Sequence, residues 1–218
     1  MRKDKKSIKD KTLLFFDTET TGLPSRDRTI RRDPFTWPRL VELGWILSRE
    51  DGTLIDSQSS IIIPDGFDIP EASSKIHGIT TDEAREKGRP VREVISEFCE
   101  DATRADMYIA HNLSFDIRII LSELIRSGKR GQLPTLPGIC TMRSSVRFCA
   151  IPGRFGKGFK WASLSFLHHA LFKVNPTGGH RALIDAHTCA SCYHELVRRG
   201  VIMGEEDITR IVFQEKRI

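Results

Sequence analysis

Short apolar runs bounded by turn residues dominate the first half of the chain. Thr12 to Phe16 is followed by acidic and glycine residues, and Glu50-Asp51-Gly52 separates the next two runs. Such runs predict β-strands, and a short turn joins antiparallel neighbours, so the first three strands are predicted to form an antiparallel meander. The five predicted strands are 12–16, 40–47, 57–63, 107–110 and 139–142.

Apolar residues at three- and four-residue spacing predict helices between and after the later strands. Thr81, Asp82 and Glu83 have the residue types of a helix start, and Gly128 follows the helix predicted at 115–126. The other helices are predicted around 91–98, at 161–172 and at 185–199. Strands followed by alternating strands and helices predict an α/β fold, in which helices flank a mixed five-stranded sheet.

Composition fits one globular domain. The 218 residues are 39% hydrophobic and 29% charged, which excludes disordered and collagen-like chains. No apolar run approaches the ~18 residues that cross a bilayer, and the charged first eleven residues lack a secretory signal. Five cysteines at irregular spacing favour reduced thiols and a cytoplasmic location. We expect a basic mobile tail at 1–11, a domain at 12–203 and a short segment at 204–218.

Positive charge is concentrated in the second half. Residues 124–184 contain ten Lys or Arg and no Asp or Glu, which leaves −5 for the rest of a chain whose net charge is +5. This distribution predicts either a surface for nucleic-acid phosphates or an ordinary solvated face. Aromatic residues that could stack on bases, or pack in the core, lie among the cations: Phe148, Phe155, Phe159 and Trp161.

Asp17 and Glu19 follow the first strand, two residues apart. In an extended chain their side chains point to the same side, and two carboxylates held close together repel. A hard divalent cation such as Mg²⁺ or Mn²⁺ would neutralise the pair, because these ions prefer oxygen ligands. An acidic surface or turn pair is the alternative.

Two later segments add polar groups at the same predicted edge of the sheet. Asp116 lies in the first turn of a helix that follows the strand ending at Ala110, and ligands bind beyond the carboxyl ends of such strands. His180 follows two glycines and precedes Asp185 by five residues. Its reference pKa of ~6.5 suits a general base. Taken singly, Asp116 could be a helix-start residue and His180 a cap or surface residue.

A second group of metal-ligand residue types is set aside. His187, Cys189, Cys192 and His194 fall within one predicted helix, at ~3.6 residues per turn, so they cannot converge on one ion. Cys189 and Cys192 are therefore predicted to be core contacts.

Taken together, three ordered motifs resemble those of the DnaQ-like, DEDDh family of 3′ to 5′ exonucleases, which have the ribonuclease H-like fold. D-x-E-T-T-G-L is matched at 17–23, H-N-x-x-F-D at 111–116 and H-x-x-x-x-D at 180–185. The similarity also includes HGIT at 77–80 and CTMR at 140–143.

The resemblance implies roles for particular residues. Asp17, Glu19, Asp116 and Asp185 would hold two Mg²⁺ or Mn²⁺ ions, and His180 would be the general base. Ordinary core packing is an open alternative for Leu23, Ile79 and Phe115. The implied substrate contacts are Thr20, Gly22, Leu23, Ile79, Asn112 and Phe115.

The implied activity is hydrolysis of phosphodiester bonds at the 3′ end of single-stranded or frayed nucleic acid, DNA favoured, with release of nucleoside 5′-monophosphates. An exoribonuclease and a non-catalytic nucleic-acid-binding adaptor on the same fold are the alternatives. The expected partner is nucleic acid with a free 3′ end, and a polymerase or repair partner stays open.

Overall fold

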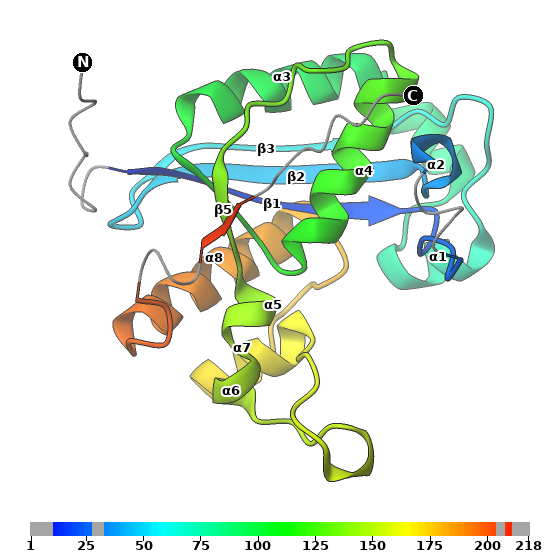
Figure 1. Ribbon diagram of the computed structural model, residues 1–218. Coiled ribbons are helices and arrows are strands. Elements are labelled where there is room, and N and C mark those ends of the chain that lie inside the picture. The colour runs from blue at the N-terminus through cyan, green and yellow to red at the C-terminus, as the bar shows by residue number, and fades with distance from the viewer. Residues whose placement is uncertain (1–10, 28–32, 204–207, 211–218) are drawn as a thin grey trace.

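The computed structural model describes residues 11–27, 33–203 and 208–210 (Figure 1). The tail predicted at 1–11 lies outside the described residues except for Lys11, and most of the segment at 204–218 does too. The sheet has the strand order β3-β2-β1-β4-β5-β6. Its strands are β1 Thr12–Thr20, β2 Leu40–Arg49, β3 Leu54–Ile61, β4 Met107–Ala110, β5 Pro137–Cys140 and β6 Ile208–Arg210.

The predicted mixed sheet is confirmed. β1, β2 and β3 pair antiparallel as a meander, whereas β4 and β5 run parallel to β1. A sixth strand, β6, pairs antiparallel with β5. It follows residue 203, where the domain was predicted to end. The fifth strand ends at Cys140 rather than at 142, because the chain turns into helix at Thr141.

The first strand is longer than the hydrophobic pattern predicted. β1 continues beyond Phe16 to Thr20, with Asp17 opposite Gly44 and Glu19 opposite Glu42 on β2. Pairing with β2 satisfies the backbone of this polar end, so the strand needs no apolar side chains there. Both carboxylates are consequently held on a rigid strand.

Helices are present wherever apolar periodicity predicted them. A helix that was not predicted, α1, has Ile76 as its only large aliphatic residue, so it lacks a periodic apolar face. The helices are α1 Glu71–His77, α2 Thr81–Lys87, α3 Val91–Arg104, α4 Leu113–Arg126, α5 Thr141–Ser144, α6 Val146–Cys149, α7 Leu164–Phe172 and α8 Ala182–Arg198, with short 3₁₀ helices η3 Pro34–Thr36 and η4 Arg154–Gly156.

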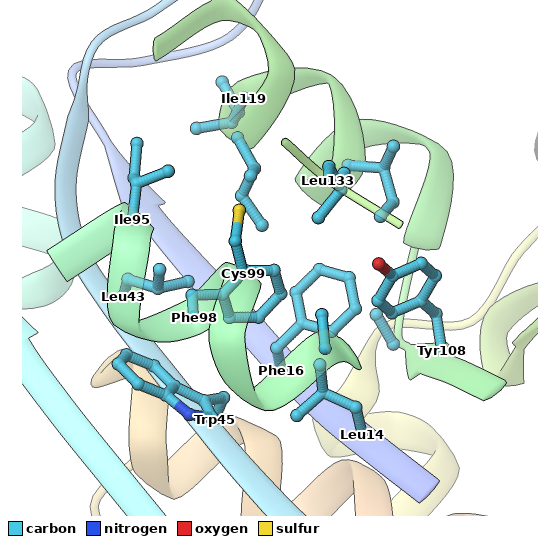
Figure 2. Close-up of a cluster of buried hydrophobic side chains, with 14 of the residues drawn as sticks. Leu14, Phe16, Leu43, Trp45, Ile95, Phe98, Cys99, Tyr108, Ile119 and Leu133 are labelled. Carbon is cyan, nitrogen blue, oxygen red and sulfur yellow. The ribbon is translucent and has the colours of Figure 1, made fainter. Parts of the chain in front are cut away.

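The helices cover both faces of the sheet (Figure 1). Alternate residues of β1 divide between two cores: Leu14 and Phe16 pack with α3 and α4, whereas Leu13 and Phe15 pack with α7 and α8. Figure 2 shows Phe16 close to Phe98 and Tyr108, with ring centroids 5.2 and 5.8 Å apart. Burial of apolar side chains on both faces of the sheet stabilises the strand that carries Asp17 and Glu19.

A buried ionic contact fixes α4 to the sheet. The carboxylate of Glu123 accepts from Arg39 Nε at 2.8 Å and from Arg126 at 2.7 Å. Glu123 is 1% exposed, so its charge requires both partners. Because Glu123 lies two turns after Asp116, this contact also fixes the start of the helix.

All five cysteines are free, and Cys189 and Cys192 lie in the core beneath α8, which confirms their predicted role. None of the helices in the described part of the chain has the length and apolar character needed to cross a membrane.

Candidate active site

The site forms where β1 projects beyond its parallel neighbour. β4 pairs with β1 only along Leu13, Leu14 and Phe15, and it ends at Ala110. The last residues of β1 therefore pass the N-terminal end of α4. This is the sheet edge at which ligands bind in open α/β folds.

Three of the predicted carboxylates meet there. Asp17, Glu19 and Asp185 each offer an oxygen atom that lies within 4.8 Å of the others, and all three are half-buried. Asp185 comes from the first turn of α8, which packs against β1 and β2. Within the ranges that the structure describes, this is the only cluster of at least three possible metal ligands.

The electrostatics of this cluster favour a cation. Burial, followed by repulsion from Asp116 and Asp185, raises the pKa of Asp17. Burial and Asp185 raise the pKa of Glu19 to about 7, and burial also raises the pKa of Asp185. Converging oxygen donors that repel one another suit a hard divalent cation, so the residues fit the metal that the fold implies.

Asp116 stands just outside the group of three. It is buried on α4, where its Oδ1 accepts a hydrogen bond of 2.8 Å from the hydroxyl of Thr18. Burial raises the pKa of Asp116 to about 7, and its charge acts on Asp17. Thr18 points to the α4 side of β1, opposite to Asp17 and Glu19, because side chains alternate along a strand.

His180 lies in the loop before α8 with a positive φ of 66°. Its backbone N–H donates to Asp185 Oδ2 at 3.0 Å, while the residue itself is exposed. Gly178, also at positive φ, permits the preceding turn. The loop is thus tied to a cluster carboxylate through its backbone, and the imidazole is left exposed.

Glu42 is a residue that the sequence reasoning missed. It lies on β2 opposite Glu19, is 1% exposed, and accepts two hydrogen bonds from Arg181 Nε at 3.0 and 3.2 Å and one from Nη2 at 2.7 Å. The backbone N–H of Ala182 donates to the same carboxylate at 2.9 Å. Glu42 therefore anchors the N-terminus of α8 between His180 and Asp185. The sequence did contain a signal for Glu42, because it is an acidic residue within the otherwise apolar strand predicted at 40–47.

A pocket of about 200 Å³, open to solvent, adjoins Glu19. Leu23 is 86% exposed and Ile76 is 60% exposed, although both are apolar. α1 contributes residues to the lining that the sequence did not suggest, because α1 itself was not predicted. The lining residues are Thr18, Glu19, Thr20, Gly22, Leu23, Ser73, Ile76, His77 and Phe115.

Two of the implied substrate contacts lie elsewhere. Ile79 is buried with Val41, Ile69 and Ala84 in a small third core. Asn112 caps the N-terminus of α4 with a positive φ of 84°, next to His111. Neither residue is among those that line the pocket.

His77 lies in the wall of the pocket, and its Nε2 atom is buried. Its Nδ1 accepts from the backbone N–H of Ile79 at 3.1 Å, so the ring proton of the neutral form lies on Nε2. Burial lowers the pKa of His77, which favours that neutral form. The geometry thus fixes the tautomer of a side chain in the pocket wall.

An α/β sheet with a cluster of acidic side chains at its strand edge, beside an exposed histidine, defines the class of metal-dependent phosphodiesterases. The chain belongs to the RNase T exonuclease family, whose model matches residues 14–193. The resemblance to DEDDh enzymes and the predicted class, a 3′ to 5′ exonuclease, are thereby confirmed.

Two curated relatives illustrate the similarity. The DNA polymerase III subunit epsilon of Treponema pallidum (strain Nichols) is 28% identical over 182 residues, which are 84% of this chain and 74% of the relative. Exodeoxyribonuclease 10 of Escherichia coli (strain K12) is 28% identical over 210 residues, which cover 90% and 74% of the two chains.

Solved structures share the fold. E. coli exonuclease I in complex with a dT13 oligonucleotide has a TM-score of 0.67 at 18% identity; the match covers 87% of this chain but only 41% of that protein. Exonuclease X in complex with 5′ overhanging duplex DNA has a TM-score of 0.59 at 25% identity, covering 89% and 96%. The nuclease domain of 3′hExo, a DEDDh member bound to rAMP, has a TM-score of 0.65 at 14% identity, covering 88% and 94%.

Proposed function

We propose that this exonuclease removes nucleotides one at a time from the 3′ end of single-stranded or frayed nucleic acid, DNA favoured, releasing nucleoside 5′-monophosphates. The convergence of Asp17, Glu19 and Asp185 beside the pocket under Leu23 carries the proposal. The DNA preference is supported by two relatives whose names specify DNA synthesis and exodeoxyribonuclease activity.

Asp17, Glu19, Asp116 and Asp185 would hold two divalent cations, Mg²⁺ or Mn²⁺. When bound, such ions neutralise charge on the attacked phosphate and lower the pKa of water towards ~7. The carboxylates supply the oxygen ligands, and the Thr18 hydroxyl holds Asp116 in one orientation. A polymerase or repair partner remains compatible with this role.

His180 is proposed as the general base. It accepts the proton of the attacking water, a role that a positioned imidazole commonly serves in general acid–base catalysis. The hydrogen bond from its backbone to Asp185 keeps the loop beside the cluster. The exposed side chain can therefore reach a water molecule in the open site.

The pocket is proposed to hold the terminal nucleotide. Leu23, Ile76 and Phe115 would contact the base through apolar surface, which tolerates any base. Thr20 and Gly22 would bring the backbone close to the nucleotide, and Ile79 and Asn112 would support these walls.

Incubation of a 3′-labelled single-stranded DNA with Mg²⁺ or Mn²⁺ tests the proposal. We expect mononucleotide release by the wild type, and a loss of at least ~10²-fold in kcat for Asp17→Ala and His180→Ala with the fold retained. Arg92→Ala, an exposed change on α3, is the control. Release of oligonucleotides instead, or full activity of both variants, would contradict the proposal.

A further inference from the structure

A small hairpin, residues 151–160, projects beyond α6 and α7 (Figure 1). Its legs are joined by the bridge between Pro152 and Phe159 and by hydrogen bonds from Gly153 N to Gly158 O and from Lys160 N to Ile151 O. A Cβ at Gly153 would stand 2.2 Å from the carbonyl oxygen of Lys157, so the turn requires glycine at that position. The hydrogen bonds and the glycine at this position therefore define the conformation of the hairpin.

The base of the hairpin is anchored in the core. Ile151 and Phe148 pack against the cluster beneath α7 and α8, and Arg199 lies 5.6 Å from the Phe148 ring. Of the four aromatic residues that the sequence placed among the cations, Phe148 thus serves packing. The other three have a different environment.

Those three aromatic side chains face solvent. Phe155 at the tip is 94% exposed, Phe159 is 51% exposed and Trp161, just after the hairpin, is 61% exposed. Phe155 also adopts a positive φ of 55°, which is unfavourable for a bulky residue. A series of exposed rings contributes little to folding and is typical of a binding surface.

Three cations lie beside these rings in the sequence. Arg154, Lys157 and Lys160 are exposed, and no salt bridge to them occurs among the residues that the structure describes. Glu123 and Asp185 are the nearest acidic residues in the sequence. The hairpin therefore presents unneutralised positive charge together with aromatic faces.

The second leg of the hairpin leads directly to the site. The carbonyl of Ala162 lies 3.1 Å from His111 Nε2, and His111 Nδ1 lies 3.0 Å from the Thr141 hydroxyl. His111 directly precedes the N-cap of α4, the helix that carries Asp116. From Ala162 to Phe155 the chain can extend at most ~25 Å, which is about seven stacked nucleotides at ~3.4 Å each.

We propose that the surface formed by Arg154, Phe155, Lys157, Phe159, Lys160 and Trp161, here called the hairpin surface, binds the single strand several nucleotides upstream of the 3′ end. Bases stack on the aromatic rings and phosphates contact the cations, without sequence preference. The inference rests on the proposed function for its substrate class. It adds a second contact area that retains the strand between successive cleavages.

The test compares a long substrate with one too short to reach the hairpin surface. Binding of a fluorescent 20-nucleotide oligo(dT) is measured by anisotropy in EDTA, where turnover is not needed, and hydrolysis of a dinucleotide is measured with Mg²⁺ or Mn²⁺. The variants are Phe155→Ser and the triple change Arg154→Ser, Lys157→Ser and Lys160→Ser. Arg92→Ser combined with Leu54→Ser removes an exposed charge and an exposed apolar side chain on other elements, as a matched control.

We expect Phe155→Ser to weaken binding of the 20-mer on the order of tenfold. The triple variant should reduce the slope of log K against log salt by about 2, since each single-strand phosphate contact contributes ~0.7. Dinucleotide hydrolysis should be unchanged in both, and the control should bind like the wild type.

Wild-type binding by both hairpin variants would overturn the proposal and leave the exposed rings to a protein partner. An equal loss in the control would overturn it as well. If the wild type binds the 20-mer in a hairpin-dependent way but does not cleave the dinucleotide or the 20-mer, the proposed hydrolysis fails while the hairpin surface stands. If the wild type cleaves the 20-mer but the hairpin variants bind it as tightly as the wild type does, the hairpin surface fails while the proposed hydrolysis stands.

Discussion

The side chains of Asp17 and Glu19 project from the same face of β1 and lie close to the carboxylate of Asp185. Each carboxylate is partly removed from water and lies close to other negative charges, so the folded protein holds protons that the unfolded chain would release. Repulsion between these partly buried carboxylates is the main electrostatic feature of the site. It also makes the stability of the metal-free protein depend on pH in a direction that can be tested.

Burial and the charge of Asp185 raise the pKa of Glu19 from its usual value of 4.5 to about 7. Between those two values the folded state binds more protons than the unfolded state, so stability falls as pH rises. In EDTA at pH 8, Glu19→Gln should therefore stabilise the protein by about 1–3 kcal/mol, measured by thermal denaturation. Added Mn²⁺ should raise the Tm of the wild type more than that of the variant, because a cation removes the same repulsion.

Glu86→Gln, at an exposed position on α2, is the control and should leave the Tm unchanged. An unchanged or lower Tm for Glu19→Gln in EDTA would show that Glu19 carries no electrostatic cost in the metal-free protein.

Glu42 is expected to act on the reaction through Arg181, as a positioning residue. Glu42→Gln keeps the shape of the side chain but leaves the Arg181 charge without its carboxylate, which costs about 1.5–3 kcal/mol. We expect kcat to fall about tenfold or more while KM for a dinucleotide changes little, since the loop that carries His180 loses its anchor. Steady-state kinetics together with the Tm measure both effects.

Ser59→Ala is the matched control, because it removes only the 3.2 Å hydrogen bond that Ser59 donates to the same carboxylate. A Glu42→Gln variant that keeps the wild-type kcat would assign Glu42 to stability alone.

At the scale of elements, the site depends on how closely α8 approaches β2. A Cβ at Gly44 would stand 2.2 Å from the backbone nitrogen of Leu183, two residues before Asp185. The missing side chain lets the first turn of the helix lie directly against the strand. The same approach brings Asp185 to Asp17, which lies opposite Gly44 in the sheet register.

Gly44→Ala should therefore displace the N-terminus of α8. The nearest atoms belong to backbone and cannot move aside by rotation, so we expect the Tm to fall by several degrees and exonuclease activity to fall about tenfold or more. Isothermal titration with Mn²⁺ should show weaker binding. A variant with unchanged Tm, Mn²⁺ affinity and activity would show that α8 can shift without affecting the cluster.

At the scale of the whole molecule, the open pocket and the proposed hairpin surface suit an enzyme that acts on unpaired 3′ ends of nucleic acid. Opening a duplex terminus costs a few kcal/mol. Blunt duplex DNA should therefore be degraded at a rate at least about tenfold lower than that of the same strand alone. Duplexes with terminal A·T pairs should react faster than those with G·C pairs. Matched single-stranded DNA, blunt duplex and RNA, digested side by side, provide the measurement.

Equal rates on single-stranded and blunt duplex DNA would contradict this expectation. A faster rate on RNA would reverse the proposed DNA preference.

Much of the fold could be predicted from the sequence because apolar periodicity reports burial directly. Leu14 and Phe16, and the spaced apolar residues of α3, α4 and α8, lie where the pattern placed them. α1, α5, α6 and β6 were not predicted, because α1 lacks a periodic apolar face and the other three elements are only three or four residues long. Their positions come from contacts with segments distant in the chain.

The sequence by itself determined the α/β class, the order of the carboxylate motifs and the family to which they belong, because these depend on local spacing. Only the tertiary structure decided that Glu42 pairs with Arg181, that Ile76 lines the pocket and that Phe155 is exposed whereas Phe148 is packed. Each of these facts concerns two or more segments far apart in the chain. Local spacing carries no information about which distant side chains a folded backbone brings within a few ångströms.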